Sequence, residues 1–184
     1  MQLIYILVYR TELANFSMQV ICYDAYPDQE WIKSIPNAEY VNLEQLFSNS
    51  NVISIHVPLL KETHHMINES AISNMKEDVV LVNTSRGEVV ETSAITRGLK
   101  SGKIFGVALD VFEGEKEWIF KDMTGEGFEN HPDLKELSCM DNVIMSSHIA
   151  FYTDESVRQI TEKTFQNFKT FVQNEALDEK AFVI

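Results

Sequence analysis

The apolar residues of this chain fall into short runs, and most runs are separated by segments of helical character. Runs rich in Val and Ile predict buried β-strands at residues 3–8, 18–24, 51–57, 79–83, 104–110 and 142–146, with a shorter strand at 38–41. Helices are predicted at residues 43–47, 70–75 and 92–101, the last one ending at Gly102. Strands that alternate with helices predict a doubly wound, Rossmann-like parallel sheet.

The C-terminal part of the chain predicts one long helix. Thr153 is a good N-cap, and Asp154 and Glu155 suit the positive end of the helix dipole. An apolar stripe runs along the helix, formed by Val157, Ile160, Thr164, Phe168 and Phe171 with Phe165 and Val172 beside it. This stripe covers either the same sheet or a second domain. We expect a sheet domain at 1–150 and a helix at 151–184, with a long loop at 116–132.

Chemically useful side chains stand just past several predicted strands. Arg86 follows VVLVNTS, Asp110 and Glu115 follow IFGVAL, and His148 follows NVIMSS. In an open parallel sheet, ligands bind outside the carboxyl ends of the strands, so these four side chains are expected to converge there. A guanidinium, two carboxylates and an imidazole can hold an anionic substrate and move a proton.

Each of these residues also has an interpretation without chemistry. Arg86 could be a surface arginine in a turn, and Asp110 could cap a strand end. Glu115 lies in an acidic stretch, where a solvated side chain is the usual case, and His148 could be a hydrogen-bonded core histidine. His64 and His65 are adjacent, which is poor spacing for one metal ion, and we interpret them as loop residues with no metal site.

Composition excludes some classes of partner. A net charge of −13 argues against nucleic acid and against an anionic membrane surface. No apolar run approaches the roughly 20 residues that span a bilayer, and the start MQLIYILVYR lacks the basic region and cleavage site of a signal peptide. Cys22 and Cys139 each adjoin apolar residues, which favours buried thiols over a disulfide. We therefore expect a cytoplasmic protein.

Three motifs together resemble a known family. NTSRGEVV, GVALDVFEGE and NVIMSSHIAFYT are similar, in order and spacing, to signatures of the D-isomer-specific 2-hydroxyacid dehydrogenases, and within that family to the D-lactate dehydrogenases. The resemblance runs from about residue 18 to about residue 171. It implies an NAD-dependent oxidoreductase that interconverts D-lactate and pyruvate, and a homodimer.

The resemblance also implies roles for individual residues. Arg86 matches the arginine that binds the substrate carboxylate and carbonyl, Glu115 the acid paired with the catalytic histidine, and His148 the proton donor. Further positions match contacts to NAD: Asp24 on the adenosine ribose, the backbone at Val57 and Pro58, and Thr63, Thr84, Arg86 and Asp110. The chemistry fits, because arginine pairs a carboxylate bidentately and imidazole titrates near neutrality. Without the resemblance, Asp24 could be a turn residue before Pro27.

One departure from the family pattern affects the cofactor. The fingerprint G-x-G-x-x-G stands about 20 residues before the ribose acid, yet no glycine precedes Gly87. The family's substrate domain has no counterpart in the sequence, so we expect a truncated dehydrogenase with weak NAD binding, impaired turnover and a tendency to self-associate. The alternatives are a non-catalytic Rossmann-like remnant that acts through protein contacts and, less favoured, an unrelated α/β protein.

Overall fold

The computed structural model describes residues 19–35, 37–117, 128 and 131–173. The chain falls into two compact units, Met1–Ser147 and His148–Ile184. The strand predicted at residues 3–8 lies outside the described residues.

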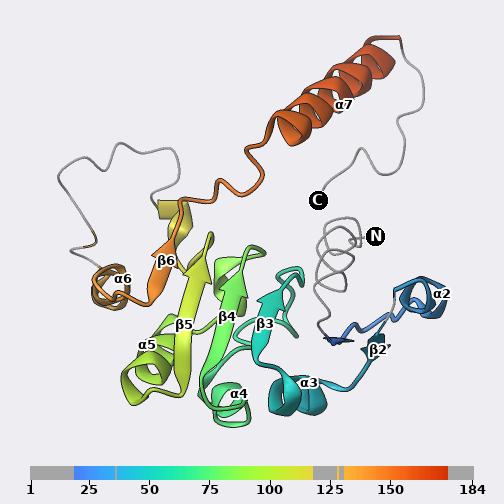
Figure 1. Ribbon diagram of the computed structural model, residues 1–184. Helices are drawn as coiled ribbons and strands as arrows, with labels where there is room; N and C mark the ends of the chain where they lie inside the picture. The colour runs from blue at the N-terminus through green and yellow to red at the C-terminus, as the bar shows by residue number, and fades with distance from the viewer. Residues whose placement is uncertain (1–18, 36, 118–127, 129–130, 174–184) are drawn as a thin grey trace. The chain divides into compact units, whose positions relative to one another are not determined.

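Four parallel strands form the main sheet of the first unit. Their order is β3 (Val52–Ile55), β4 (Val79–Asn83), β5 (Ile104–Leu109) and β6 (Val143–Met145), and their arrows point the same way in Figure 1. A separate two-stranded parallel sheet is formed by β1 (Val20–Cys22) and β2 (Ala38–Tyr40). Since all pairings are parallel, the carboxyl ends of neighbouring strands share an edge, which confirms the predicted sheet class.

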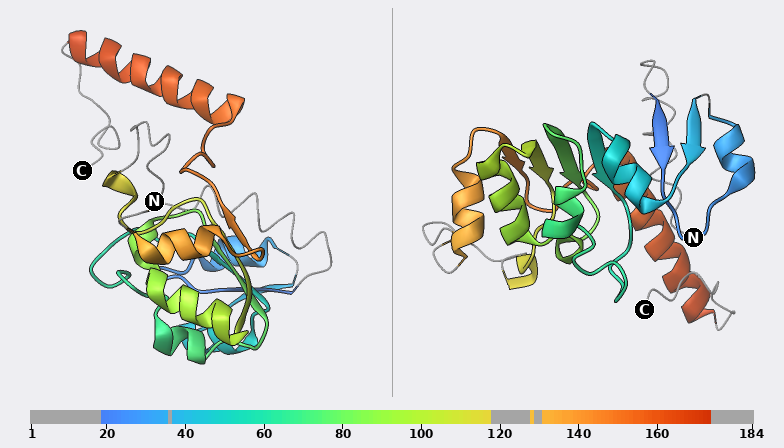
Figure 2. Two further views of the ribbon diagram at one scale, coloured as in Figure 1. Left: turned by 90° about the vertical axis from the view of Figure 1, so that its left-hand side faces the viewer. Right: turned by 90° about the horizontal axis from the view of Figure 1, so that it is seen from below.

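Helices connect the strands and cover one face of the main sheet. Figure 2 shows α4 (Glu69–Ser73), α5 (Thr92–Ser101) and α6 (Pro132–Ser138) side by side on that face. Two further helices, α2 (Gln29–Lys33) and α3 (Leu43–Asn49), flank β2, and short 3-10 turns occupy Gly87–Val89 and Glu115–Glu117. These crossovers are what a parallel sheet requires, because consecutive parallel strands cannot be joined by a tight hairpin.

The core of the first unit lies between the main sheet and these helices. Val79, Leu81, Ile95 and Ile104 are among its fully buried side chains. Gly98 of α5 lies against Ile104, where an added Cβ would come within 2.5 Å of the Ile104 side chain. This close approach of helix and strand fixes the position of α5 against β5 and, through it, the loops at the carboxyl edge.

Two short helices depart from the sequence prediction. No pattern indicated α2, a helix of five residues whose N-cap Asp28 accepts the N–H groups of Glu30 and Trp31. Most of the loop predicted at 116–132 lies outside the described residues, but its last position is wrong: Pro132 begins α6, because its fixed φ suits a first helical turn. Neither cysteine forms a disulfide, as expected, but the prediction of buried thiols is wrong for one of them: Cys22 is buried and Cys139 is exposed.

The second unit is built on α7 (Asp154–Val172), which confirms the long helix and its cap. The Thr153 hydroxyl accepts the N–H of Ser156 at 3.2 Å. None of the residues of α7 is buried, and the apolar side chains at positions 160, 165, 168 and 171 are all more than half exposed. No described residue of the second unit covers the apolar face of α7.

Candidate functional site at the carboxyl edge of the sheet

The turn after β4 is shaped by a buried amide side chain. The Oδ1 of Asn83 accepts the Ser85 N–H at 3.0 Å and the Ser85 hydroxyl at 2.8 Å, while its Nδ2 donates to the Arg86 carbonyl at 3.0 Å. Asn83 is only 1% exposed, so these bonds satisfy its amide away from water. The result is a fixed turn in which Thr84 and Arg86 are exposed at the carboxyl edge, and the Arg86 guanidinium donates to the Ser85 carbonyl at 2.7 Å.

Gly87 brings this turn into direct contact with the segment after β5. An ideal Cβ on Gly87 would lie 2.1 Å from the carbonyl carbon of Phe112 and 2.7 Å from the Glu113 nitrogen. Only a residue without a side chain permits that approach. Arg86 and Glu115 therefore stand on two turns whose backbones touch.

The segment after β5 begins with Asp110 and contains the tight turn Phe112–Glu115. The Asp110 N–H donates to the Asn83 carbonyl, and its carboxylate accepts the Ser146 hydroxyl at 2.6 Å, which ties the ends of β4, β5 and β6 together. Glu115 is 6% exposed and accepts the Phe112 N–H at 3.2 Å. The interpretation of Glu115 as a solvated side chain is therefore wrong: the turn folds its carboxylate inward.

The sequence did not predict one interacting pair in this region, Glu113 and His65. Glu113 binds His65, 48 positions earlier, and also the Thr92 N–H at the start of α5. Burial raises the pKa of the Glu113 carboxyl, but the bonds from Thr92 and His65 outweigh it and hold that pKa below its usual range. Nothing in the sequence pattern signals this contact, because its members come from separate loops. His64 and His65 do lie in a turn, as predicted, with their rings 4.0 Å apart.

The loop after β3 is held in shape by Thr63. Its hydroxyl donates to the Pro58 carbonyl at 2.6 Å and accepts the Leu60 N–H at 2.8 Å. The backbone at Val57 and Pro58 is thereby fixed just past the carboxyl end of β3. The three positions assigned to cofactor contact by resemblance thus form one local structure.

Asp24 follows the end of β1 and is half-buried. One of its carboxylate oxygens accepts the Tyr26 N–H at 2.9 Å, an arrangement typical of a turn. This bond uses one carboxylate oxygen, and a carboxylate can accept several bonds, so the turn is compatible with both interpretations of Asp24.

His148 opens the second unit. It has a φ of +54°, a left-handed conformation that non-glycine residues rarely adopt, and its ring lies edge-on to Phe151 at 6.5 Å. Strained conformations of this kind are concentrated at functional positions. The convergence of His148 with Arg86 and Glu115 stays a prediction.

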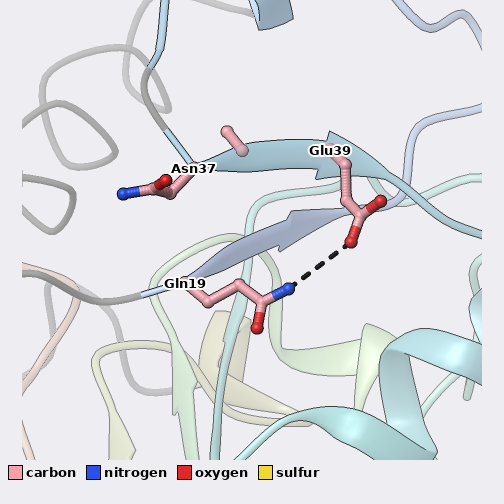
Figure 3. A pocket seen from close by; sticks show the side chains of 4 residues that line it. Gln19, Asn37 and Glu39 are labelled. Atoms are coloured by element: carbon pink, nitrogen blue, oxygen red, sulfur yellow. Dashed lines mark hydrogen bonds between the residues drawn. The ribbon is translucent and has the colours of Figure 1, made fainter.

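The hollow drawn in Figure 3 lies away from this edge. It has a volume of about 450 Å³ and is lined by Gln19, Asn37, Ala38 and Glu39, at the amino ends of β1 and β2. Across the described part of the chain, no three His, Cys, Asp or Glu side chains are grouped to bind a metal ion. Among the same residues, no helix is long and apolar enough to cross a bilayer.

Known proteins match most of the chain. Residues 9–150 match the family model described as D-isomer specific 2-hydroxyacid dehydrogenase, NAD binding domain. A D-lactate dehydrogenase of Lactobacillus delbrueckii subsp. bulgaricus is 43% identical over 163 residues, which cover 87% of this chain and 47% of that protein. A D-specific alpha-keto acid dehydrogenase of Enterococcus faecalis is 39% identical, over 86% of this chain and 47% of that protein.

Solved structures give the same result. The crystal structure of D-lactate dehydrogenase from Aquifex aeolicus complexed with NAD and lactic acid has a TM-score of 0.81 and 43% identity, covering 92% of this chain and 50% of that one. A D-lactate dehydrogenase with NAD⁺ from Lactobacillus jensenii has a TM-score of 0.85 at 29% identity. The chain spans about half the length of the relatives it matches.

Proposed function

The chain belongs to the D-isomer specific 2-hydroxyacid dehydrogenase family, and on that premise we propose that it carries the NAD-binding part of an oxidoreductase that interconverts D-lactate and pyruvate. The observation that carries the proposal is the contact between the turn of Arg86 and the turn of Glu115, which Gly87 makes possible. The contact brings the backbones of these two turns together at the edge where parallel sheets bind ligands, which supports a site made of a cation for the substrate and a buried acid.

Each residue has a separate task in the proposed reaction. Arg86 binds the carboxylate of the 2-oxo acid and polarises its ketone, since a guanidinium fork matches a planar carboxylate. His148 donates a proton to the ketone oxygen, and Glu115 orients the imidazole. The hydride itself comes from the nicotinamide of NADH when it is bound.

The described residues at the carboxyl edge suit NAD. Asp24 accepts the ribose hydroxyls and repels a 2′-phosphate, which favours NAD over NADP. The Thr63-braced backbone at Val57 and Pro58, together with Thr84 and Asp110, completes the contacts. Because no glycine precedes Gly87, the pyrophosphate lacks its usual cradle, and each lost charge-assisted hydrogen bond costs roughly 1.5–3 kcal/mol. We expect weak binding.

The proposed substrates are small 2-oxo acids. Relatives are named for D-lactate and alpha-keto acids, and a more distant one is a glyoxylate reductase of Thermofilum pendens, 38% identical. Arg86 recognises the carboxylate and ketone that such substrates share, and pyruvate is the member we propose. We expect no measurable pyruvate reduction by these residues alone, because Arg86 is exposed and an exposed ion pair is weak.

Fluorescence titration tests the cofactor assignment. The wild-type chain is titrated with NADH and with NADPH, beside Asp24→Ala and the control Asp141→Ala, which changes an exposed acid in the turn before β6. We expect saturable NADH binding in about the millimolar range, weaker NADPH binding, and loss of this preference in Asp24→Ala alone. Equal binding of both cofactors by the wild-type chain contradicts the role of Asp24. Micromolar NADH affinity contradicts the weight given to the missing glycines, and the absence of saturable NADH binding contradicts the proposed function itself.

A second candidate function rests on α7. Its exposed apolar face favours a non-catalytic module that acts through protein contacts, with a second copy of the chain as the proposed partner. Light scattering of the wild-type chain and of the triple variant Phe165→Ser, Phe168→Ser, Phe171→Ser tests for self-association. A dimer or larger species that becomes monomeric in the variant supports self-association through α7. A wild-type monomer contradicts it.

A further inference from the structure

The side chains of His65 and Glu113 meet outside the set of residues assigned to chemistry. His65 Nε2 lies 2.5 Å from one oxygen of Glu113, and the other oxygen accepts the Thr92 N–H at 2.7 Å. The side chains are 35% and 30% exposed, so this pair is more sheltered than a typical surface ion pair. Three separate segments are joined at one carboxylate: the turn after β3, the turn after β5 and the first turn of α5.

At α5, Glu113 replaces a missing helix cap. The side chain of the N-cap residue Glu91 makes no capping bond to the helix backbone, and the N–H of the buried Thr92 donates to Glu113 instead. A carboxylate is favoured at this end of a helix by the helix dipole and by the unpaired N–H groups of the first turn. The contact therefore anchors Glu113 to an element that is itself fixed in the core.

The backbone holds His65 in place for this contact. Its φ is +51°, its N–H donates to the Glu88 carbonyl at 2.9 Å, and its own carbonyl accepts the Asn68 side chain at 3.0 Å. A non-glycine residue in the left-handed region persists only where its surroundings determine it. The backbone from which the His65 imidazole reaches Glu113 is thus fixed on both sides of the residue.

Glu113 is two residues from Glu115 and belongs to the same tight turn. Within the turn, Glu115 N–H donates to the Phe112 carbonyl, and the Glu115 carboxylate accepts the Phe112 N–H. Between the two acids stands Gly114 with a φ of +78°, so the turn has a conformationally permissive residue at its centre. An anchor on Glu113 therefore limits the positions that the Glu115 carboxylate can take.

We propose that His65 and Glu113 form a positioning pair that holds the Phe112–Glu115 turn against α5 and thereby orients Glu115. Its consequence for catalysis rests on the proposed function, in which Glu115 orients the proton donor. The pair does not touch the reacting atoms in this scheme. It acts only through the turn that carries Glu115.

Hydrogen exchange and carboxyl NMR test the pair without cofactor or turnover. The amide exchange rates of Thr92 and Phe112 and the ¹³C carboxyl resonance of Glu115 are measured in the wild-type chain, in Glu113→Ala and in Glu113→Gln. Glu77→Gln serves as the control, since Glu77 is an exposed acid paired with Lys103. In Glu113→Ala we expect both amides to exchange about tenfold faster and the Glu115 resonance to shift. Glu113→Gln, which keeps an acceptor oxygen, is expected to lie between Glu113→Ala and the wild type.

The outcomes separate a positioning role from a purely structural one. Faster exchange at Thr92 with Phe112 and Glu115 unchanged means that Glu113 only caps α5, and the proposal fails. No change at either amide means that the contact itself is wrong. If Glu113→Ala unfolds, His65→Asn is judged by the same criteria, because asparagine tolerates the left-handed backbone and is too short to replace the imidazole. A failed NADH titration leaves these results untouched.

Discussion

Replacement of Gly87 by alanine tests whether the turns of Arg86 and Glu115 depend on direct backbone contact. The added Cβ would lie 2.1 Å and 2.2 Å from the carbonyl carbon and oxygen of Phe112, and both are main-chain atoms that cannot rotate away. To make room, the turn of Arg86 and the turn of Glu115 must move apart by about an ångström, and the packing between them is lost. We expect destabilisation of about 3 kcal/mol.

Thermal unfolding followed by circular dichroism measures this loss. At about 2–4 °C per kcal/mol for a chain of this size, the melting temperature of Gly87→Ala should fall by about 6–12 °C. Gly102→Ala is the matched control, because Gly102 has a φ of +80° and open space around its Cβ position. That variant carries only the cost of the left-handed backbone, about 1–2 kcal/mol. A loss in Gly87→Ala no larger than in Gly102→Ala would refute the close contact.

Two further predictions concern Asn83, which is buried, and Glu113, which is half-buried. Asn83→Ala leaves the Ser85 N–H and the Arg86 carbonyl without their partner, so urea denaturation should show a loss of about 1–3 kcal/mol; an unchanged midpoint would contradict the role of Asn83 in the turn. Since the pKa of Glu113 is lowered on folding, its contribution to stability is present above its ordinary pKa of 4.5 and is lost as the pH falls through the folded value. Below about pH 4.5, Glu113→Gln should therefore lose less stability than the wild type as the pH falls, measured as the free energy of unfolding in urea at several pH values. An identical pH dependence in the two proteins would contradict the bonds of Glu113 to Thr92 and His65.

The sequence predicted best those elements whose local signals agree with their packing. The run VVLVN became β4 without a change of bounds, and the helix at 92–101 ends at Gly102, which takes the left-handed C-cap conformation. In both cases one segment contains the apolar pattern and its own termination signal. The same apolar runs placed Arg86 and Glu115 after two strands, β4 and β5, that are neighbours in the sheet.

What the sequence did not reveal depends on contacts between distant segments. The burial of Glu115 follows from a turn that folds back on Phe112, and the pairing of Glu113 joins residues 48 positions apart. Asn83 looked like the end of a strand, yet it organises the whole turn that carries Arg86. Helix α6 was missed because Pro132 was interpreted as a loop residue instead of a helix start.

The most direct test of the account is the distance between the Glu115 carboxylate and the His148 imidazole in crystals of the chain. The proposed role of Glu115, orienting the imidazole that donates the proton, requires these groups to lie within hydrogen-bond reach, about 2.6–3.2 Å, beside the Arg86 guanidinium. We predict that distance, with Arg86 facing the same cleft. Side chains of Glu115 and His148 that point to opposite sides of the sheet would contradict the proposed mechanism.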